Sequence, residues 1–393
     1  MVNGVIFLCV SNRYNKNYMR NDFNLDSSLI YLNHAAVAPW PVRTVNAVKQ
    51  FANENGAVGS SHYLEWLKIE QQLKENLATL INAQSADEIA LLKNTSEGLS
   101  IIARGIQWQP GDNIVICNEE FPSNFIVWDA LRAQGVELRI ANITGSEYPE
   151  KAIIEQMDAS TRLLSISAVQ YASGLRMNLE LLGKACKSYH ALYCVDAIQQ
   201  IGALQFDVQA MDADFVIADG HKWMLGPEGL ALFYCKASSM DELQLQQFGW
   251  HMVEDLYNFD NMHHWQPASS ARRFECGSPN TVAIHALNAS IGLLLERGMD
   301  SIESAVLDNV KALITLFSDL ADIAILSPID RNRYAGIFNF RKNNTNQELL
   351  YQNVVKKGVV CALRGGGIRL SPHYYNQQSE FEKLIEYVTD FSA

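Results

Sequence analysis

The sequence predicts an α/β fold, in which helices cover both faces of a mainly parallel β-sheet, followed by a smaller α+β domain. Short apolar runs bounded by polar residues alternate with amphipathic stretches over about the first 280 residues. Such runs are typical of buried strands and the amphipathic stretches of helices, and their alternation indicates a parallel sheet. The chain has 393 residues, which is too long for one compact core of ordinary size, so we expect two domains.

The expected elements follow one another in a regular order. Residues 91–106 have the pattern of a strand end, a loop and a helix. Buried strands are expected at 113–120, 163–170, 191–197, 214–220 and 229–235, with helices at 122–134 and 178–190. From about Asn280 helical periodicity takes over at 285–321, followed by a short strand near 337–340 and a helix at 379–391. This last third is the expected smaller domain.

Composition narrows the function. The net charge is -12, and no basic run offers a surface for nucleic acid, so we expect no nucleic-acid partner. No apolar stretch approaches the length of a membrane span, and the short apolar run at 5–10 lacks the basic leader of a signal peptide. Seven scattered cysteines without a CxxC pair indicate reduced thiols and a cytoplasmic protein. No HExxH motif or similar spacing of metal ligands occurs, so we expect no metal site.

Two polar residues stand at the ends of expected strands and carry the main chemical indication. Asp196 follows the apolar run at 191–195, and Lys222 follows the run at 214–218. Ligands of open α/β sheets gather at the carboxyl ends of strands. A lysine that forms a Schiff base and an acid that holds a pyridinium nitrogen are the minimum equipment for pyridoxal 5'-phosphate (PLP) chemistry.

The stretch VDAIQQIGALQFDVQAMDADFVIADGHKWMLGPEGLALFY resembles the cofactor-lysine region of the class V aminotransferases, which include cysteine desulfurases, kynureninases and isopenicillin N epimerases. The resemblance runs from about Tyr31 to the C-terminus. It implies a fold-type I PLP-dependent transferase with a mainly parallel, mixed seven-stranded sheet, a small amino-acid substrate and a homodimer. We expect a large PLP-binding domain at 45–275 and a small domain from 20–44 and 276–393. Residues 1–19 are expected to be a disordered extension or to precede a start at Met19.

The resemblance implies roles for four residues around the cofactor ring. Lys222 would form the Schiff base and then shuttle the substrate's α-proton. Asp196 would pair with the ring nitrogen, and Gln199 would reach the ring oxygen by a hydrogen bond. His221 would lie near the phosphate or the Schiff base, although a histidine packed beside the lysine is equally expected.

A second group is expected to bind the phosphate. Asn94 and Glu97 have the spacing of a helix cap, so the segment opens a helix whose free N–H groups and dipole favour an anion. Thr95 and Ser96 add hydroxyl donors, and the family's Thr-Thr-Glu-Gly pattern supports this interpretation over a plain helix start. The segment 274–280 resembles the family's Glu-x-Gly-Thr-Pro-Asn motif, in which the hydroxyl residue, here Ser278, contacts the phosphate bound by the other subunit.

Three residues are expected beside the cofactor. Phe121 stands where kynureninases place a phenylalanine on the pyridine ring and desulfurases place a histidine. Tyr171 and Ser173 resemble a cofactor-facing loop of the kynureninases. Gln170 departs from the asparagine that is usual there.

The segment 364–376 resembles the family's substrate motif. Arg369 matches the arginine that holds the substrate carboxylate through a bidentate fork, and Arg364 is a weaker candidate. Desulfurases carry a flexible loop with a nucleophilic cysteine between these two positions, whereas this chain has Gly-Gly-Gly-Ile. Cys361 precedes the turn in an apolar run, where we expect a buried and inert thiol. Further candidates for the substrate pocket, each of which could instead be packing, are Asn33, His34, His62, Trp250 and His251.

These residues predict a PLP-dependent transferase or lyase that acts on an amino acid, as a transaminase or as a lyase at the β-carbon. The alternatives are an amino-acid epimerase of the isopenicillin N epimerase type and a PLP-binding protein without turnover. A persulfide-type cysteine desulfurase is disfavoured because the cysteine loop is missing. The sequence does not name the substrate.

Overall fold

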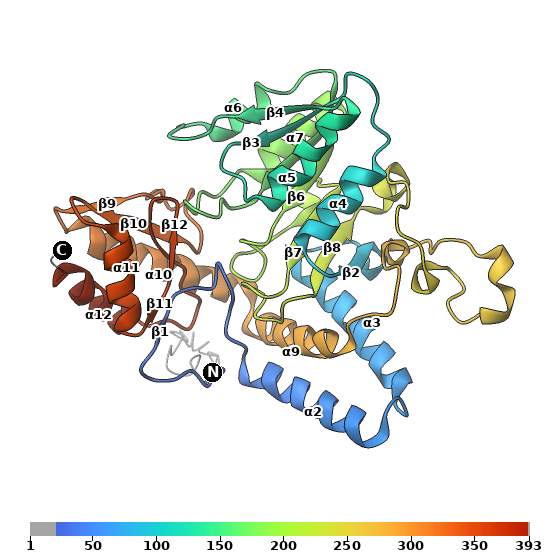
Figure 1. The fold of residues 1–393 in the computed structure, drawn as a ribbon, viewed down its shortest axis with the longest axis horizontal. Helices are drawn as coiled ribbons and strands as arrows, with labels where there is room; N and C mark the ends of the chain where they lie inside the picture. The colour runs from blue at the N-terminus through green and yellow to red at the C-terminus, as the bar shows by residue number, and fades with distance from the viewer. Residues whose placement is uncertain (1–20, 392–393) are drawn as a thin grey trace, which may run out of the picture.

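The computed structural model describes residues 21–391, so the expectations for residues 1–19 lie outside the described residues. The described chain forms a large lobe around one sheet and a smaller lobe that holds the C-terminus (Figure 1). Within residues 21–391, no helix combines the length and the apolar character needed to cross a bilayer. The domain boundaries at 45 and 276 remain predictions.

The large lobe is built on a seven-stranded sheet. Its strands are β2 (Ile89–Leu92), β3 (Asn113–Cys117), β4 (Glu137–Ala141), β5 (Thr161–Ser167), β6 (Leu192–Asp196), β7 (Phe215–Asp219) and β8 (Ala231–Cys235). They lie in the order β2-β8-β7-β6-β5-β3-β4, and only β8 runs against the others. The predicted α/β fold with a mainly parallel, mixed seven-stranded sheet is confirmed.

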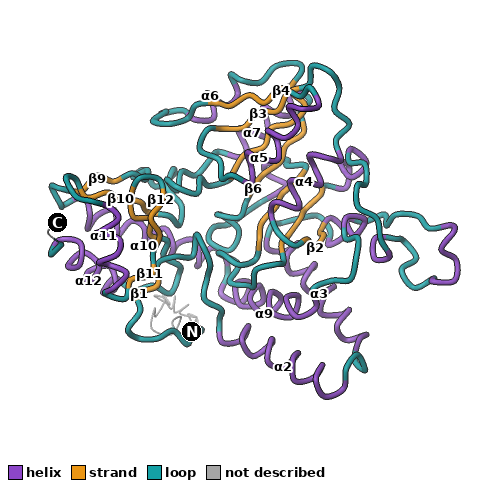
Figure 2. The backbone as a smooth tube through the Cα atoms, viewed as in Figure 1, coloured by secondary structure: helices purple, strands orange, loops and turns teal. Residues whose placement is uncertain are grey.

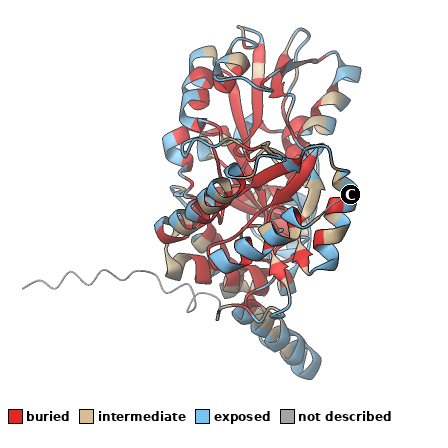
Figure 3. Cartoon of the chain, turned by 90° about the vertical axis from the view of Figure 1, so that its left-hand side faces the viewer, coloured by how far each residue is buried: buried red, intermediate tan, exposed pale blue. Residues whose placement is uncertain are grey.

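Helices cover both faces of this sheet, as Figure 2 shows. Neighbouring residues of one strand pack into two separate apolar clusters. Val115 packs with helices α3 (Tyr63–Leu80), α7 (Leu179–Tyr189) and α9 (Thr281–Arg297), while Ile114 packs with α4 (Thr95–Gly105) and α5 (Ser123–Asp129). This alternation follows from the pleat of a strand. The strands are buried between the layers (Figure 3). The helices of the large lobe are α2 (Val42–Val58), α3 (Tyr63–Leu80), α4 (Thr95–Gly105), α5 (Ser123–Asp129), α6 (Pro149–Ile154), α7 (Leu179–Tyr189), α8 (Val208–Met211) and α9 (Thr281–Arg297).

The smaller lobe is an α+β unit. Its sheet has the order β12-β13-β10-β9, with β9 (Ile323–Ile325), β10 (Phe338–Lys342), β12 (Ala362–Arg364) and β13 (Gly367–Leu370). Helices α10 (Met299–Ser318), α11 (Gln347–Lys356) and α12 (Gln378–Thr389) pack against it. The N-terminal strand β1 (Ile30–Tyr31) pairs in parallel with β11 (Val359–Val360), so the N-terminal segment packs with the C-terminal lobe.

A candidate active site at the carboxyl edge of the sheet

The sheet brings the residues singled out in the sequence to one edge. Strand β6 ends at Asp196, and Lys222 lies in the turn that follows β7. Phe121 follows β3, Tyr171 follows β5, and Thr95 begins the helix after β2. Because these five strands run in the same direction, their carboxyl ends lie along one edge, where open α/β sheets bind ligands.

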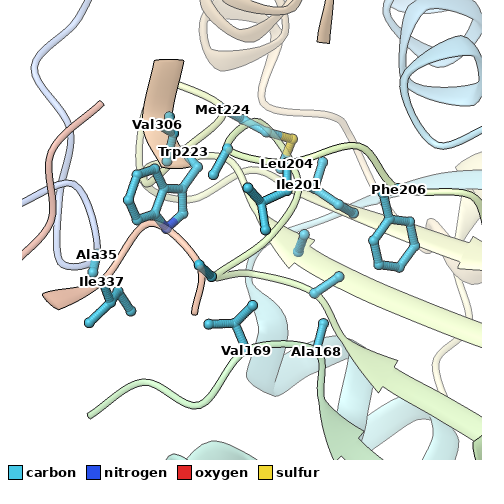
Figure 4. Packing of buried hydrophobic residues seen from close by; sticks show 14 of the residues in the cluster. Ala35, Ala168, Val169, Ile201, Leu204, Phe206, Trp223, Met224, Val306 and Ile337 are labelled. Atoms are coloured by element: carbon cyan, nitrogen blue, oxygen red, sulfur yellow. The ribbon is translucent and has the colours of Figure 1, made fainter. Parts of the chain in front are cut away.

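The turn that carries Lys222 is held by its neighbour Trp223. The Trp223 indole is fully buried among apolar side chains (Figure 4), and its Nε1 donates to Gln199 Oε1 at 2.9 Å. The Nε2 of His373 donates to the Trp223 carbonyl at 3.2 Å. Gly202 passes so close that a Cβ there would lie 2.3 Å from this carbonyl oxygen. The backbone beside Lys222 is therefore fixed from three sides.

Lys222 has the environment of a reactive amine. Burial lowers its pKa to about 8, although the negative charge of Asp196 opposes this shift. The Nζ atom lies 5.7 Å from the centre of the Phe121 ring, and Phe121 meets Tyr171 edge to face at 5.2 Å between ring centres. A lysine with a lowered pKa is partly uncharged near neutral pH and can attack a carbonyl carbon.

Asp196 is the acid that faces this lysine. Its side chain is buried and accepts a hydrogen bond from the Ile198 amide at 3.1 Å. Burial raises its pKa to about 7, and a cation beside the carboxyl group would favour its ionised form. A protonated ring nitrogen is a cation of the required kind.

Gln199 and His221 flank this pair. The Gln199 amide donates to the Ala35 carbonyl at 3.0 Å, which leaves one amide hydrogen for a further acceptor such as a ring oxygen. The Nδ1 atom of His221 lies 3.1 Å from Asp219 Oδ1, but both atoms are buried and neither makes a hydrogen bond. The structure therefore places His221 beside Lys222 and close to Asp219, with no hydrogen bond that fixes its role.

The start of α4 has the features of an anion site. The predicted helix cap is present, because Asn94 Oδ1 accepts from the Glu97 amide at 2.9 Å. The hydroxyl of Thr95 is buried without a partner, and Ser96 donates to Ser123 at 2.9 Å. Free backbone N–H groups, the helix dipole and an unpaired hydroxyl together fit a phosphate group.

Arg369 lies on the smaller lobe and faces the same edge. Its side chain is buried, its Nη1 donates to the Tyr171 carbonyl at 2.7 Å, and its Nε has no partner. Burial lowers the pKa of this guanidinium to about 10. A buried guanidinium with a free donor fits a carboxylate ligand. Arg364 is exposed on the neighbouring strand β12. Arg369 is paired with Ala362 of that strand, and Arg364 comes two residues after Ala362. Since side chains two residues apart point to the same face of a sheet, both arginines lie on one face.

The connection between these arginines is as short as a hairpin allows. Gly365 and Gly366 form a two-residue turn, with φ values of 59° and 79° that favour glycine. A Cβ on Gly365 would lie 2.9 Å from the Ala172 Cβ, so the turn packs on the loop after β5. Cys361 is buried, and burial raises the pKa of its thiol to about 12. The position of the desulfurase loop is therefore closed, and the adjacent thiol is protonated.

Other predicted residues are already bonded within the protein. Ser173 donates to Glu119 at 3.1 Å. His34 is fully buried, with Nδ1 donating to the Ser371 carbonyl at 2.8 Å and Nε2 accepting from the Tyr375 hydroxyl at 2.7 Å. Both ring nitrogens are thus occupied, so His34 offers no free hydrogen bond to a substrate in this conformation. The neighbouring Asn33 keeps a buried Oδ1 without a partner.

The remaining candidates lie apart from this group. Ser278 is exposed and accepts from Trp250 Nε1 at 3.3 Å, so its predicted contact with a phosphate depends on a second subunit. His62 lies in the connection between α2 and α3, where Nδ1 is 3.3 Å from Glu54. Within a single chain, neither Ser278 nor His62 lies with the residues around Lys222.

His251 belongs to a buried charged cluster with Glu70 and Glu275. Their ligand atoms lie close enough to hold a metal ion. However, the Lys74 ammonium lies 2.8 Å from Glu275 and 3.4 Å from Glu70. The lysine therefore supplies the positive charge that a metal would bring to this cluster.

Sequence reasoning missed three residues that shape the site: Trp223, His373 and Glu120. Trp223 and His373 lie within the motifs quoted above, but only the fold shows that they meet. Glu120 directly precedes Phe121, and its neighbour Glu119 looks the same in the sequence.

Comparisons with known proteins show the family of this chain. The family model for class-V aminotransferases matches residues 30–384. A probable cysteine desulfurase of Methanothermobacter thermautotrophicus is 31% identical, with 95% of this chain and 98% of that protein covered. A cysteine desulfurase of Salmonella agona is 27% identical, with 92% and 93% covered.

Solved structures share the fold. The apo cysteine desulfurase of Thermococcus onnurineus is 24% identical with a TM-score of 0.84, and covers 94% of this chain and 96% of its own. The complex of the cystine C–S lyase C-DES with its product cysteine persulfide is 20% identical with a TM-score of 0.86, covering 93% and 99%.

Proposed function

Since the chain belongs to the class-V aminotransferase family of PLP-dependent enzymes, we propose that it cleaves a bond at the β-carbon of a small amino acid. The curated relatives are named cysteine desulfurases, and one protein of the same fold is described as a cystine C–S lyase. Both descriptions concern a carbon–sulfur bond at the β-carbon. A sulfur-containing amino acid is therefore the first substrate to test.

Bound PLP would act as an electron sink for the substrate's α-carbon. Lys222 would hold the cofactor through Nζ, and its amine, once displaced, would move the α-proton. Asp196 would keep the ring nitrogen protonated, and the exposed face of Phe121 would stack on the ring. The start of α4, with Thr95 and Ser96, would hold the phosphate.

Arg369 would orient the substrate. A guanidinium can pair with both oxygens of the α-carboxylate, which fixes the direction of the bond that breaks. The unpaired Nε supports this role because a buried donor normally has a partner. Arg364, at the exposed rim of the same hairpin, would add positive charge at the entrance.

The closed β12–β13 turn is the observation that favours a lyase without an enzyme-bound persulfide. The turn has two residues, and Cys361 is buried with a pKa of about 12. A protonated, enclosed thiol is a poor nucleophile. In the proposed reaction sulfur therefore leaves with a small molecule instead of passing to a protein cysteine.

A substrate panel tests the proposal. The purified protein is incubated with cysteine, cystine, alanine, aspartate and kynurenine, and pyruvate, ammonia, sulfide and persulfide are measured. We expect pyruvate and ammonia with a persulfide or sulfide product from a sulfur-containing amino acid. If the amino group is instead transferred to the cofactor and a keto acid is formed, the protein is a transaminase and the lyase proposal is wrong.

Lys222→Ala tests the site itself. The variant should lose the visible absorbance of lysine-linked PLP, whereas Lys187→Ala, which removes an exposed lysine, should keep it. Normal absorbance and turnover in Lys222→Ala would refute the assignment.

We further propose that the protein acts in the cytoplasm as a homodimer, with a large PLP-binding domain at 45–275 and a small domain formed by 20–44 and 276–393. The six cysteines of the described chain are free, which agrees with a reducing compartment. The dimer follows from the family resemblance around Ser278.

A further inference from the structure

Glu120 is a buried acid that the proposed mechanism does not use. It lies between β3 and the ring-stacking Phe121, at the carboxyl edge of the sheet. Only 9% of its surface is exposed. A buried carboxyl group costs free energy unless it is hydrogen-bonded or paired.

Five hydrogen-bond donors surround the Glu120 carboxyl group. Its Oε1 accepts from the Ser167 amide at 2.9 Å, from Gln170 Nε2 at 3.3 Å and from Cys117 Sγ at 3.3 Å. Its Oε2 accepts from Asn124 Nδ2 at 2.7 Å and from the Ser167 hydroxyl. The Ser167 backbone N–H and the NH₂ group of Asn124 can only donate, so the arrangement suits an acceptor-only, ionised carboxylate.

The orientation of Asn124 supports this assignment. Its Oδ1 accepts from Trp128 Nε1 at 2.9 Å and from the Ser165 hydroxyl at 2.6 Å. The indole N–H can only donate, so this end of the amide must be the oxygen. The other end is then the NH₂ group, which must donate to Glu120.

The same network adjoins Asp196. Ser167, which makes two hydrogen bonds to Glu120, is paired in register with Asp196 on the neighbouring parallel strand. Paired residues of adjacent strands lie about 5 Å apart and point to the same face. One serine therefore separates Glu120 from the acid proposed to hold the ring nitrogen.

We propose that Glu120 is a second, fixed negative charge behind Asp196, which strengthens proton binding at the junction of Asp196 and the cofactor's ring nitrogen. The inference rests on the proposed PLP function and deepens it. Glu120 acts through Asp196 and touches neither cofactor nor substrate, so it is a positioning residue. A nearby negative charge makes proton loss from this junction less favourable. The departure of Gln170 from the family's asparagine fits this role, since its amide is turned to Glu120.

Other charges also face the junction. Lys222 favours the ionised form of Asp196, and Asp219 opposes it together with Glu120. Burial raises the pKa of Glu120 above its ordinary value, and the hydrogen bonds from Ser167 and Asn124 oppose part of this shift. A test must therefore change Glu120 alone and read the proton at the ring nitrogen directly.

The experiment uses Glu120→Gln, which removes the charge and keeps the shape. Wild type and variant are loaded with PLP labelled with ¹⁵N in the ring, and the ¹⁵N chemical shift is followed against pH. We expect the midpoint for loss of the ring proton to fall by about one pH unit in the variant. The alkaline limb of the kcat profile should move in the same direction.

Asp214→Asn is the matched control. Asp214 is also a largely buried carboxylate that accepts from a backbone amide, Tyr193 at 2.8 Å, and from a serine hydroxyl, Ser239. Burial raises its pKa as well. It lies at the start of β7, at the opposite edge of the sheet, so its loss should leave the ring-proton midpoint unchanged.

Ser167→Ala tests the role of Glu120 if the Glu120→Gln variant does not fold. It removes one donor that keeps Glu120 ionised, so it should give a smaller shift in the same direction. An unchanged midpoint in the folded Glu120→Gln variant, or in Ser167→Ala if only that variant folds, would overturn the inference. Failure of wild type to form lysine-linked PLP would instead refute the proposed function, and is seen separately in the absorbance.

Discussion

At the scale of single residues, the most telling feature is a set of buried polar atoms that make no hydrogen bond. Thr95 Oγ1, His221 Nδ1, Asp219 Oδ1 and Arg369 Nε are all enclosed and make no hydrogen bond. Buried polar groups normally find a partner, so unpaired ones call for an explanation. All four lie on segments that meet at the carboxyl edge of the sheet. A ligand with phosphate and carboxylate groups would satisfy several of them.

Arg369→Lys should reduce kcat/KM for the amino acid by about 100-fold, because lysine cannot reproduce the two-pronged pairing with a carboxylate. PLP binding should stay unchanged, since its proposed anchors lie elsewhere. Steady-state kinetics with the amino acid and its decarboxylated amine measure the effect. Arg364→Lys, at the exposed rim, is the control and should lose far less. Equal rates for acid and amine in wild type would contradict a carboxylate clamp.

The lowered pKa of Lys222 predicts a pH effect on the cofactor-free protein. The folded pKa is about 8, against 10.5 for an ordinary lysine, so between these values the unfolded chain binds the proton that the folded chain lacks. Stability from this group therefore rises as the pH increases from 8 to 10.5. Lys222→Met should raise the free energy of unfolding at pH 7 by on the order of 2 kcal/mol and remove this rise.

Urea titrations of the cofactor-free protein at several pH values measure this difference. Lys187→Met, which changes an exposed lysine, should leave the pH dependence as in wild type. If the free energy of unfolding of the wild type stays flat or falls from pH 8 upward, as it does in Lys222→Met, the pKa of Lys222 is not lowered in the folded protein.

The sequence could single out Lys222 and Asp196 as candidates because a polar residue at the end of an apolar strand is a local pattern. It could not identify Glu120, since the choice between Glu119 and Glu120 depends on which side chain turns inward after β3. That choice is made by Asn124, four residues further along, and by Ser167, which comes from the distant strand β5. The contact of His373 with Trp223 likewise joins two lobes and leaves no mark in either segment.

At the scale of elements, the strands were largely predictable and their directions were not. The apolar run of β8 resembles those of its parallel neighbours, because a strand buried on both faces shows no alternation. Only the short connection from β7, which includes Lys222, makes the two strands antiparallel. Several predicted strands were also too long: β3 ends at Cys117, and the acids that follow it lie at the candidate site.

Gly202→Ala tests the turn that carries Lys222. Gly202 has a φ of 96°, and a Cβ there would lie 2.3 Å from the Trp223 carbonyl oxygen. We expect a loss of about 3 kcal/mol in the free energy of unfolding, from backbone strain and the clash together. Gly111→Ala, with a φ of 95° and open space around it, should cost about 1 kcal/mol. Equal losses in thermal or urea unfolding would mean that the close approach to Trp223 is unimportant.

Cys361→Ser should leave turnover of the sulfur-containing substrate within about twofold of wild type, because the thiol is buried, protonated and outside the proposed chemistry. Product formation measures turnover, and mass spectrometry of the intact protein during turnover detects sulfur added to cysteine. A persulfide trapped on Cys361, together with loss of activity in the variant, would contradict the proposal.

At the scale of the whole molecule, the site is assembled from both ends of the chain. The N-terminal strand β1 pairs with β11, and the Ala38 amide donates to the His221 carbonyl at 2.8 Å. The smaller lobe adds Arg369 and His373. The resemblance anticipated this union of termini, whereas composition and periodicity alone could predict only two layers of helices on a sheet.

A homodimer is the expectation that belongs to this scale. The segment 248–265 projects from the large lobe (Figure 1) and exposes several aromatic side chains: Phe248, Tyr257, Phe259 and Trp265. Exposed aromatic groups of this kind often mark an interface.

Sedimentation velocity should show a dimer, and Ser278→Ala should increase PLP dissociation about tenfold by removing one donor to the phosphate. A fully active monomer would contradict the shared site.

The two-glycine turn between Arg364 and Arg369 also has an evolutionary and engineering consequence. A hairpin tip is the place where inserted residues cost least, since each doubling of a flexible loop adds only about 0.6 kcal/mol of closure entropy. The cost here is chiefly the contact of Gly365 with Ala172, which an insertion would replace. A loop of some ten residues with one cysteine, grafted at this point, would bring a mobile thiol to the rim of the pocket. The length of this one turn would then decide whether sulfur passes to a protein cysteine or leaves with a small molecule, while the sheet and Lys222 stay unchanged.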